Sequence, residues 1–281
     1  MAYKIIVDSC CDARAVPTGD IPVLQVPLVL NIGGSSYVDD GTLNSVWQVS
    51  AMRAAKDQPS TACPSPAEYA DAMSGDDDAF VITLSANLSG SYQSAMAGLE
   101  LKTGSGRVHV FNSCSASAGE AAIAFELARL IHKGLSFDDI VEQGEAYLRS
   151  MRTFFVLESL DYLIKAGRIG KFSGQLATIM QIRPIMGEDG DGNIIPIAKV
   201  RGTNPALRRM VEQVKMQDEK MREAGRPQKH LVICHCNCPE RALDVKKMIQ
   251  EACPNIVDIT ILPTGGVSTF YAFDGGIVVA Y

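Results

Sequence analysis

Short apolar runs alternate with amphipathic segments along the first half of the chain. The runs have the length of buried strands, and the segments after them carry apolar residues at helical spacing. Strands that alternate with helices in this way predict a parallel sheet covered by helices on both faces. We therefore expect an α/β fold in which residues 1–153 form a doubly wound domain. The expected strands cover residues 3–7, 79–84 and 107–111, and the helices after the last two cover residues 91–101 and 120–132.

The pattern is less regular between the first two of these strands. Residues 21–30 form an extended segment rich in valine, leucine and proline, and a Gly-Gly turn follows it. Residues 35–40 then lead into a helix expected near residues 42–56. The prolines around residues 60–65 should hold that loop stiff and extended. This stretch is thus expected to supply one extended segment, one helix and a loop.

The second half of the chain, residues 154–281, has a different pattern. Two apolar runs flank the sequence EDGDG, which predicts a β-hairpin. Helices are expected to begin near Asn204 and Pro239, and the last two strands enclose a glycine-rich loop. We expect an α+β domain on a mixed or antiparallel sheet. Its strands are expected at residues 182–186, 194–200, 231–235, 257–262 and 277–281.

A strand, a loop of small residues and a helix follow one another at residues 79–101. This order places hydroxyl groups and unpaired backbone N–H groups at one point. Ser89 is the expected N-cap of the helix, and Gly90 lets a ligand come close to the backbone. The first turn of a helix favours an anion because of its unpaired donors and the helix dipole. The stretch therefore predicts the polar end of a ligand site.

Hydroxyl groups also follow the other strands of the expected parallel sheet. Ser9 follows the first strand, Ser113 follows the strand at residues 107–111, and Thr61 lies in the stiff loop. Ligands of such sheets bind at the carboxyl ends of the strands. Any one of these hydroxyls can be explained by turn formation alone. Together with Ser89 they offer several donors and few charges, which suits a carboxylate or a phosphate.

Three alternative kinds of site have weaker support. A serine hydrolase would use Ser89 as its nucleophile, but the G-x-S-x-G pattern is absent and no base is evident. Cys234, Cys236 and Cys238 would point to one face of a strand, but their spacing departs from that of zinc sites, so we expect no metal. A sensor module that binds only small carboxylates would need no place for an apolar tail.

The overall charge and composition exclude several classes of partner. The net charge is −6 and no basic cluster occurs, so we expect no nucleic acid. The opening residues turn polar too soon for a signal peptide. The longest apolar-leaning run, residues 21–32, is broken by prolines and is too short to insert stably into a membrane. We therefore expect a cytoplasmic protein whose eight cysteines are thiols.

Two arginines lie beside glycines at the ends of expected elements. Arg168 belongs to the sequence GRIGKFSG after a short helix, and Arg201 precedes a glycine after a strand. Each can be explained as a cation that complements the end of its own element. Each could equally belong to a contact surface for a partner.

Six short motifs, taken in their order, resemble the DegV family of bacterial fatty-acid-binding proteins. No single motif is decisive, but six in the family's order along nearly the whole chain are quite specific. LSGSYQSA is close to a family signature. The motifs are IIVDSCCD, VPLVLNIGGSSYVDD, PSTACPSP, LSGSYQSA, LESLDYLIKAGRIG and KVRG.

The resemblance implies two α/β domains with one long-chain fatty acid between them. It implies that Thr61 and Ser89 hydrogen-bond the carboxylate. The family's third contact is a histidine, and Tyr271 stands at that position here, where its hydroxyl can donate. The resemblance also implies a carrier that is not itself an enzyme, needs no cofactor and presents the carboxylate to an ATP-dependent fatty acid kinase. Arg168 and Arg201 are the docking candidates for that kinase.

Overall fold

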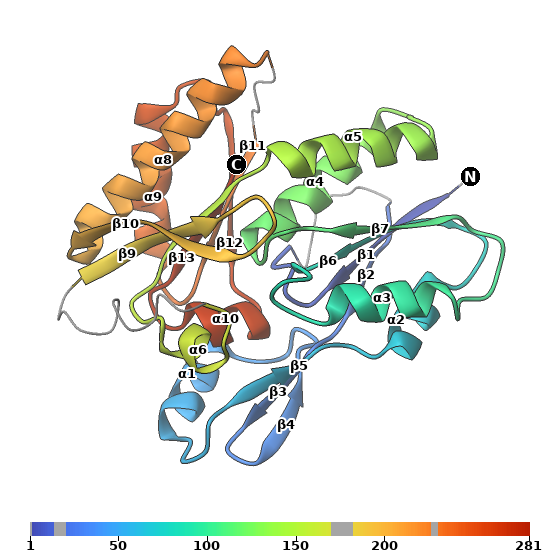
Figure 1. The fold of residues 1–281 in the computed structure, drawn as a ribbon, viewed down its shortest axis with the longest axis horizontal. Helices are drawn as coiled ribbons and strands as arrows, with labels where there is room; N and C mark the ends of the chain where they lie inside the picture. Colours follow the sequence, from blue (N-terminus) through green and yellow to red (C-terminus); the bar gives the residue numbers. More distant parts are fainter. Residues whose placement is uncertain (1, 14–20, 170–181, 226–229) are drawn as a thin grey trace.

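Two large sheets and one small sheet make up the protein, with helices between and around them (Figure 1). The computed structural model describes residues 2–13, 21–169, 182–225 and 230–281. Within these ranges, no helix combines the length and the apolar character that crossing a membrane requires. In Figure 1 the N-terminal half, coloured blue to green, lies to the right and below, and the orange and red C-terminal half lies to the left.

A parallel four-stranded sheet forms the centre of the N-terminal half. Its strand order is β2-β1-β6-β7, and all three neighbouring pairs run parallel. The two central strands, β1 and β6, are almost entirely buried because helices cover both faces. The parallel sheet predicted from the alternating pattern is confirmed. Its strands are β1 (Tyr3–Asp8), β2 (Val23–Val26), β6 (Asp78–Thr83) and β7 (Val108–Asn112).

Different helices cover the two faces of this sheet (Figure 1). Neighbouring side chains of a strand point to opposite faces, so Ile5 packs in one hydrophobic cluster with α4 while Ile6 packs in another with α2 and α3. Ser65 caps α2 through a reciprocal bond pattern with Glu68, and Pro66 lies in the first turn of this helix. The helices are α2 (Pro66–Met73), α3 (Ser91–Leu99), α4 (Ala118–His132) and α5 (Phe137–Ser150).

The C-terminal half is built on a mixed sheet of order β10-β9-β8-β13-β11-β12. The pair β11 and β12 is parallel, and the other four pairs are antiparallel. Helices α8 and α9 cover its outer face (Figure 1). The predicted hairpin and the predicted mixed sheet are confirmed. The elements are β8 (Thr153–Val156), β9 (Ile182–Glu188), β10 (Ile194–Arg201), β11 (His230–His235), β12 (Asp258–Pro263), β13 (Ile277–Ala280), α8 (Thr203–Glu223) and α9 (Pro239–Ala252).

Helix α4 packs against both large sheets. One buried cluster contains Phe80 and Ile82 of the parallel sheet, Val232 and Val278 of the mixed sheet, and Leu127 of α4. Five alanines of α4 belong to the same cluster, and their small side chains let the two sheets approach the helix closely. The two halves of the chain therefore share this hydrophobic cluster.

A small antiparallel sheet, which the sequence pattern does not predict, lies below the parallel sheet in Figure 1. We call it the three-stranded sheet, and its order is β4-β3-β5. The segment expected at residues 21–30 is split, because β2 and β3 belong to different sheets. Residues 35–40 contain a strand that was not predicted, and the helix expected after them near residues 42–56 is confirmed. The elements are β3 (Val29–Ile32), β4 (Ser35–Val38), β5 (Ser60–Ala62) and the helix α1 (Ser45–Ala54).

The glycine-rich loop expected near the end of the chain contains a helix, α10 (Gly266–Ala272). The prediction of a plain loop is therefore wrong. Glycine and β-branched residues are poor helix formers, so the local sequence does not indicate this helix. Its start is stabilised from outside, because the N–H groups of Gly266 and Val267 donate to the buried carboxylate of Asp39. Those are donors that a helix start leaves unpaired.

Candidate functional site

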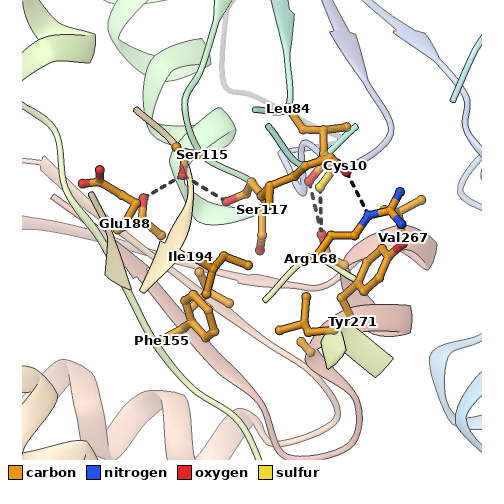
Figure 2. A pocket seen from close by; sticks show the side chains of 18 of the residues that line it. Cys10, Leu84, Ser115, Ser117, Phe155, Arg168, Glu188, Ile194, Val267 and Tyr271 are labelled. Atoms are coloured by element: carbon orange, nitrogen blue, oxygen red, sulfur yellow. Dashed lines mark hydrogen bonds between the residues drawn. The ribbon is translucent and has the colours of Figure 1, made fainter. Parts of the chain in front are cut away.

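An apolar cavity lies between the two halves of the protein (Figure 2). Its empty volume, which includes space open to the solvent, is about 790 Å³. Leu84, after β6, lines it from the N-terminal half. Phe155 of β8, Ile194 of β10 and Val267 of α10 line it from the C-terminal half. Most of the lining side chains are apolar, so the cavity can hold a long apolar group.

A second hollow adjoins this cavity and carries polar groups. Its empty volume is about 600 Å³, and we call it the polar mouth. Thr61, Ser89 and Tyr271 all line it, together with Gly90. The structure thus brings together the three residues predicted to hold a carboxylate, and that role stays a prediction. The residues that line both the cavity and the polar mouth are Leu84, Leu88, Arg168, Val267 and Tyr271.

The hydroxyl groups of Thr61 and Tyr271 meet at the polar mouth. Thr61 Oγ1 and Tyr271 Oη are 2.8 Å apart, a hydrogen bond in which either group can donate. Thr61 lies on β5 and Tyr271 on α10, so the bond joins the two halves of the chain. Two hydroxyls carry two protons, and the bond between them uses one. The other proton can be donated to a carboxylate oxygen beside them.

Ser89 is held by its own loop at the start of α3. Its N–H donates to Ser85 O at 3.1 Å, and its Oγ accepts from Ser91 N at 3.2 Å. The N-cap of α3 is Gly90, so the predicted cap at Ser89 is wrong by one residue. An added Cβ at Gly90 would lie 3.0 Å from Cys63 Sγ. A glycine therefore keeps this side of the polar mouth open.

Arg168 lies where the cavity meets the polar mouth, close to Tyr271 (Figure 2). It follows the short helix α6 (Asp161–Lys165), and its Nε donates to Leu88 O at 3.0 Å. Its guanidinium places a positive charge at the wall of the polar mouth, which the sequence did not indicate. The predicted docking role of Arg168 stays a prediction. The rest of its motif, from residue 170 on, lies outside the described residues.

The tip of the β9–β10 hairpin lies at the opposite side of the cavity from Arg168. Figure 2 shows Glu188, at the end of β9, on that side. Ser85 Oγ donates to Gly192 O at 3.0 Å, and Asn87 Nδ2 donates to Asp191 O at 2.8 Å. The hairpin tip is therefore fastened to the loop that carries Ser89. The cavity has the polar mouth at one end and a packed hairpin at the other.

Three other residues predicted as site candidates line neither the cavity nor the polar mouth. Ser9 Oγ accepts from Leu28 N at 2.9 Å. Ser113 Oγ donates to Ser115 O at 3.0 Å, which shapes its own turn. Arg201 is exposed at the end of β10. The neighbours of the first two serines, Cys10 and Ser115, line the cavity instead, because the strand ends turn there.

The two rival chemistries find no further support in the described residues. In the described residues the Ser89 hydroxyl bonds to the Ser91 hydroxyl at 3.1 Å, whereas His109 bonds to Glu145 at 3.0 Å and His230 to Thr260 at 2.9 Å. Strand β11 ends at His235, so Cys236 and Cys238 lie beyond it, and the prediction that one strand carries all three thiols is wrong. Among the residues described, no group of three or more metal-ligating side chains is arranged to hold an ion.

Three buried acids lie behind the loops of the site. Asp8 accepts from Leu84 N at 2.9 Å and from Cys10 N at 3.0 Å, and so fixes two loops that line the cavity. Burial raises the pKa of Asp8 to about 6 and the pKa of Asp12 to about 6. Burial and the nearby Asp8 charge raise the pKa of Glu120 well above its usual value. Neither carboxyl oxygen of Glu120 has a hydrogen-bond partner, so no donor stabilises its charged form.

We expect the free energy of unfolding to fall as the pH rises above about 4.5, the ordinary pKa of a glutamate. Because the pKa of Glu120 is raised on folding, the folded protein holds a proton there that the unfolded chain has already released. Such stabilisation is complete below the unfolded pKa and is lost as the pH rises through the folded pKa. The slope should reach about 1.4 kcal/mol per pH unit, measured by urea unfolding at several pH values.

The matched variant for this measurement is Glu120→Gln, which keeps the shape of the side chain and cannot titrate. Its stability should fall less steeply with pH than that of the wild type, and the fall that remains, up to about pH 6, belongs to Asp8 and Asp12. Burial lowers the pKa values of His230 and His235, which makes the stability rise with pH, so neither histidine can cause the fall. An unchanged slope in the Glu120→Gln variant would show that another group carries the pH dependence.

Comparison with protein families gives one match over almost the whole chain. The family model described as "Uncharacterised protein, DegV family" matches residues 2–281. A DegV domain-containing protein of Streptococcus pneumoniae is 32% identical over 286 residues, which cover 100% of this chain and 99% of that protein. A DegV domain-containing protein of Streptococcus gordonii is 32% identical over 287 residues, with the same coverage.

Solved structures of similar sequence share the fold. A DegV family protein from Ruminococcus gnavus, with vaccenic acid, has a TM-score of 0.90 at 36% identity, over 100% of this chain and 99% of that one. The Streptococcus pneumoniae Fatty Acid Kinase (Fak) B3 protein, loaded with linoleic acid, has a TM-score of 0.88 at 31% identity and the same coverage. The resemblance indicated by the six motifs is confirmed: this chain belongs to the DegV family.

Proposed function

We propose that this protein binds one long-chain fatty acid, with the acyl chain in the apolar cavity and the carboxylate in the polar mouth. The observation that carries the proposal is the shape of the site, an apolar space that adjoins a hollow lined by Thr61, Ser89 and Tyr271. A ligand with one small polar end and a long apolar tail fits this arrangement. The vaccenic acid and linoleic acid of the two similar structures support the same class of ligand.

The energetics favour such a ligand. Burial of an acyl chain gains about 0.8 kcal/mol per methylene, so a long chain gains on the order of 10 kcal/mol before costs. Association entropy and desolvation of the carboxylate oppose this gain. The spare hydroxyl proton of the Thr61–Tyr271 pair and the cation of Arg168 reduce the second cost. Binding should therefore be tight and slow to reverse.

We infer that the protein acts as a carrier that presents the bound carboxylate to an ATP-dependent fatty acid kinase, and that it has no chemistry of its own. The similarity to a protein described as a fatty acid kinase B3 protein supports this role. A further hollow, lined by Ser89, Gly90, Gly167 and Arg168, opens beside the polar mouth. Its position would give an enzyme access to the carboxylate. Arg168 and Arg201 remain the proposed contacts with that enzyme.

Native mass spectrometry of protein purified from bacteria tests the proposal most directly. We expect a bound mass of one long-chain fatty acid per chain, released as free acid by solvent extraction. Protein that is empty, and stays empty after incubation with acids of about 14 to 18 carbons, would contradict it. Affinity should rise with chain length, since each methylene adds buried area. A flat dependence would favour the small-carboxylate sensor instead.

A further inference from the structure

The carboxylate of Asp39 sits directly on the start of α10. Asp39 follows β4 and is fully buried. Gly266 N donates to its Oδ1 at 3.0 Å, and Val267 N donates to its Oδ2 at 2.8 Å. An added Cβ at Gly266 would lie 2.5 Å from Asp39 Oδ1. The close approach therefore requires a glycine at the start of this helix.

Helix α10 depends on such contacts for its position. It has seven residues, and isolated helices of that length are unstable in water. Asp12 Oδ1 accepts from Gly265 N at 2.7 Å, and Gln48 Nε2 donates to Gly266 O at 2.7 Å. Asp12, Asp39 and Gln48 all come from the N-terminal half, whereas α10 follows β12 in the C-terminal half. The orientation of α10 is therefore set from across the interface between the halves.

Residues in or beside the three-stranded sheet contact α10 both at its start and near its end. Tyr271 follows Val267 by four residues, so both lie on one face of α10, and both line the polar mouth. Tyr271 Oη meets Thr61 on β5, which pairs with β3. Asp39 N donates to Leu28 O at 2.9 Å, next to β3. The three-stranded sheet thus fixes the start of α10 and also supplies the partner of the tyrosine near its end.

We infer that Asp39 is a positioning residue for the polar mouth. It lines neither hollow of the site, so it acts through α10, which it holds in the orientation that sets the Tyr271 hydroxyl opposite Thr61. The consequence for carboxylate binding rests on the proposed function. The consequence for the position of Tyr271 does not, because it concerns the protein without ligand.

The first test reads Tyr271 in the ligand-free protein. Tyrosine labelled with ¹³C at Cζ gives one NMR signal per residue, and Tyr271→Phe identifies the signal of Tyr271. Asp39→Asn keeps the shape but turns one acceptor into an amide group that faces the helix N–H donors. We expect the Tyr271 signal to shift in Asp39→Asn and to stay in place in Asp40→Asn, which changes the exposed neighbour. An unmoved signal in Asp39→Asn would overturn the inference.

The second test separates positioning from general stability. We expect Asp39→Asn to weaken binding of an 18-carbon fatty acid about tenfold and binding of the matching fatty alcohol less than twofold. In a protein that already carries Tyr271→Phe, Asp39→Asn should weaken binding of the acid little further. Equal losses for acid and alcohol, or additive losses in the double variant, would overturn the inference. Failure of the proposed function looks different, because the wild-type protein would then bind neither compound.

Gly266→Ala disturbs the contact between Asp39 and the start of α10 by a change in the helix. It is a second test that does not depend on whether Asp39→Asn folds. Its added methyl group meets the Asp39 carboxylate, while Asp39 itself is unchanged. We expect the same shift of the Tyr271 signal, and again a larger loss of affinity for the acid than for the alcohol. A Gly266→Ala protein with the wild-type signal and wild-type affinity for the acid would contradict the role of Asp39, whatever the behaviour of Asp39→Asn.

Discussion

Replacement of Ile194 by tryptophan should remove most of the affinity for long-chain fatty acids while the protein stays folded. Ile194 on β10 projects into the apolar cavity (Figure 2), so a tryptophan there occupies space proposed for the acyl chain. Exclusion of about four methylene groups costs about 3 kcal/mol, roughly a 200-fold loss of affinity. Isothermal titration calorimetry with an 18-carbon acid, after removal of any copurified lipid, measures the change.

The matched control is Ile195→Trp, at the next residue of the same strand. Neighbouring side chains of a strand point to opposite faces, and Ile195 does not line the cavity. This variant should bind the 18-carbon acid as the wild type does. The Ile194→Trp variant should still bind shorter acids, because the polar mouth is untouched. Wild-type affinity of Ile194→Trp for the long acid would show that the acyl chain lies elsewhere.

The double variant Thr61→Val with Ser89→Ala should lose affinity for fatty acids, because each substitution removes one hydroxyl group from the polar mouth. An unmade hydrogen bond to a buried carboxylate costs about 1–3 kcal/mol, so the pair should cost about 2–6 kcal/mol. The loss of the Thr61 hydroxyl also leaves Tyr271 without its partner at 2.8 Å. Competition binding against a fluorescent fatty acid measures the effect.

Two controls make this result specific to the head group. Ser60→Ala, at the exposed neighbour of Thr61 on β5, should leave the affinity unchanged. The matching fatty acid methyl ester has no charged carboxylate, so its weaker binding should be changed much less by the double variant. If the double variant binds the acid as tightly as the wild type, the carboxylate does not lie at the polar mouth.

The sequence predicted the large sheets because their central strands are buried on both faces. Continuous apolar runs such as residues 79–84 are distinctive. The three-stranded sheet was missed for the opposite reason. Three of the four residues of β4 are exposed, and β5 has only three residues. Their strand character comes from pairing with β3 and has no signal in the local pattern.

The candidate site was predicted in part for similar reasons. Ser89 and Gly90 belong to a strand–loop–helix sequence that indicates an anion site locally, whereas Thr61 and Tyr271 were assigned by resemblance. The bond between the last two joins residues 210 positions apart, and the bond from Gly266 to Asp39 spans 227 positions. Contacts between residues so far apart in the sequence depend on how α10 packs against the N-terminal half. Helix propensity did not predict α10 itself. The position of Arg168 at the polar mouth likewise depends on packing between the halves.

Because α4 belongs to the core of both large sheets, neither half can be removed without loss of the other. A chain cut between residues 153 and 154 would leave the alanine-rich face of α4 without Val232 and Val278, and the mixed sheet without its cover on that face. Each fragment would expose a broad apolar surface to water. We therefore expect the two halves to unfold together in one cooperative transition, although the sequence pattern predicts two domains.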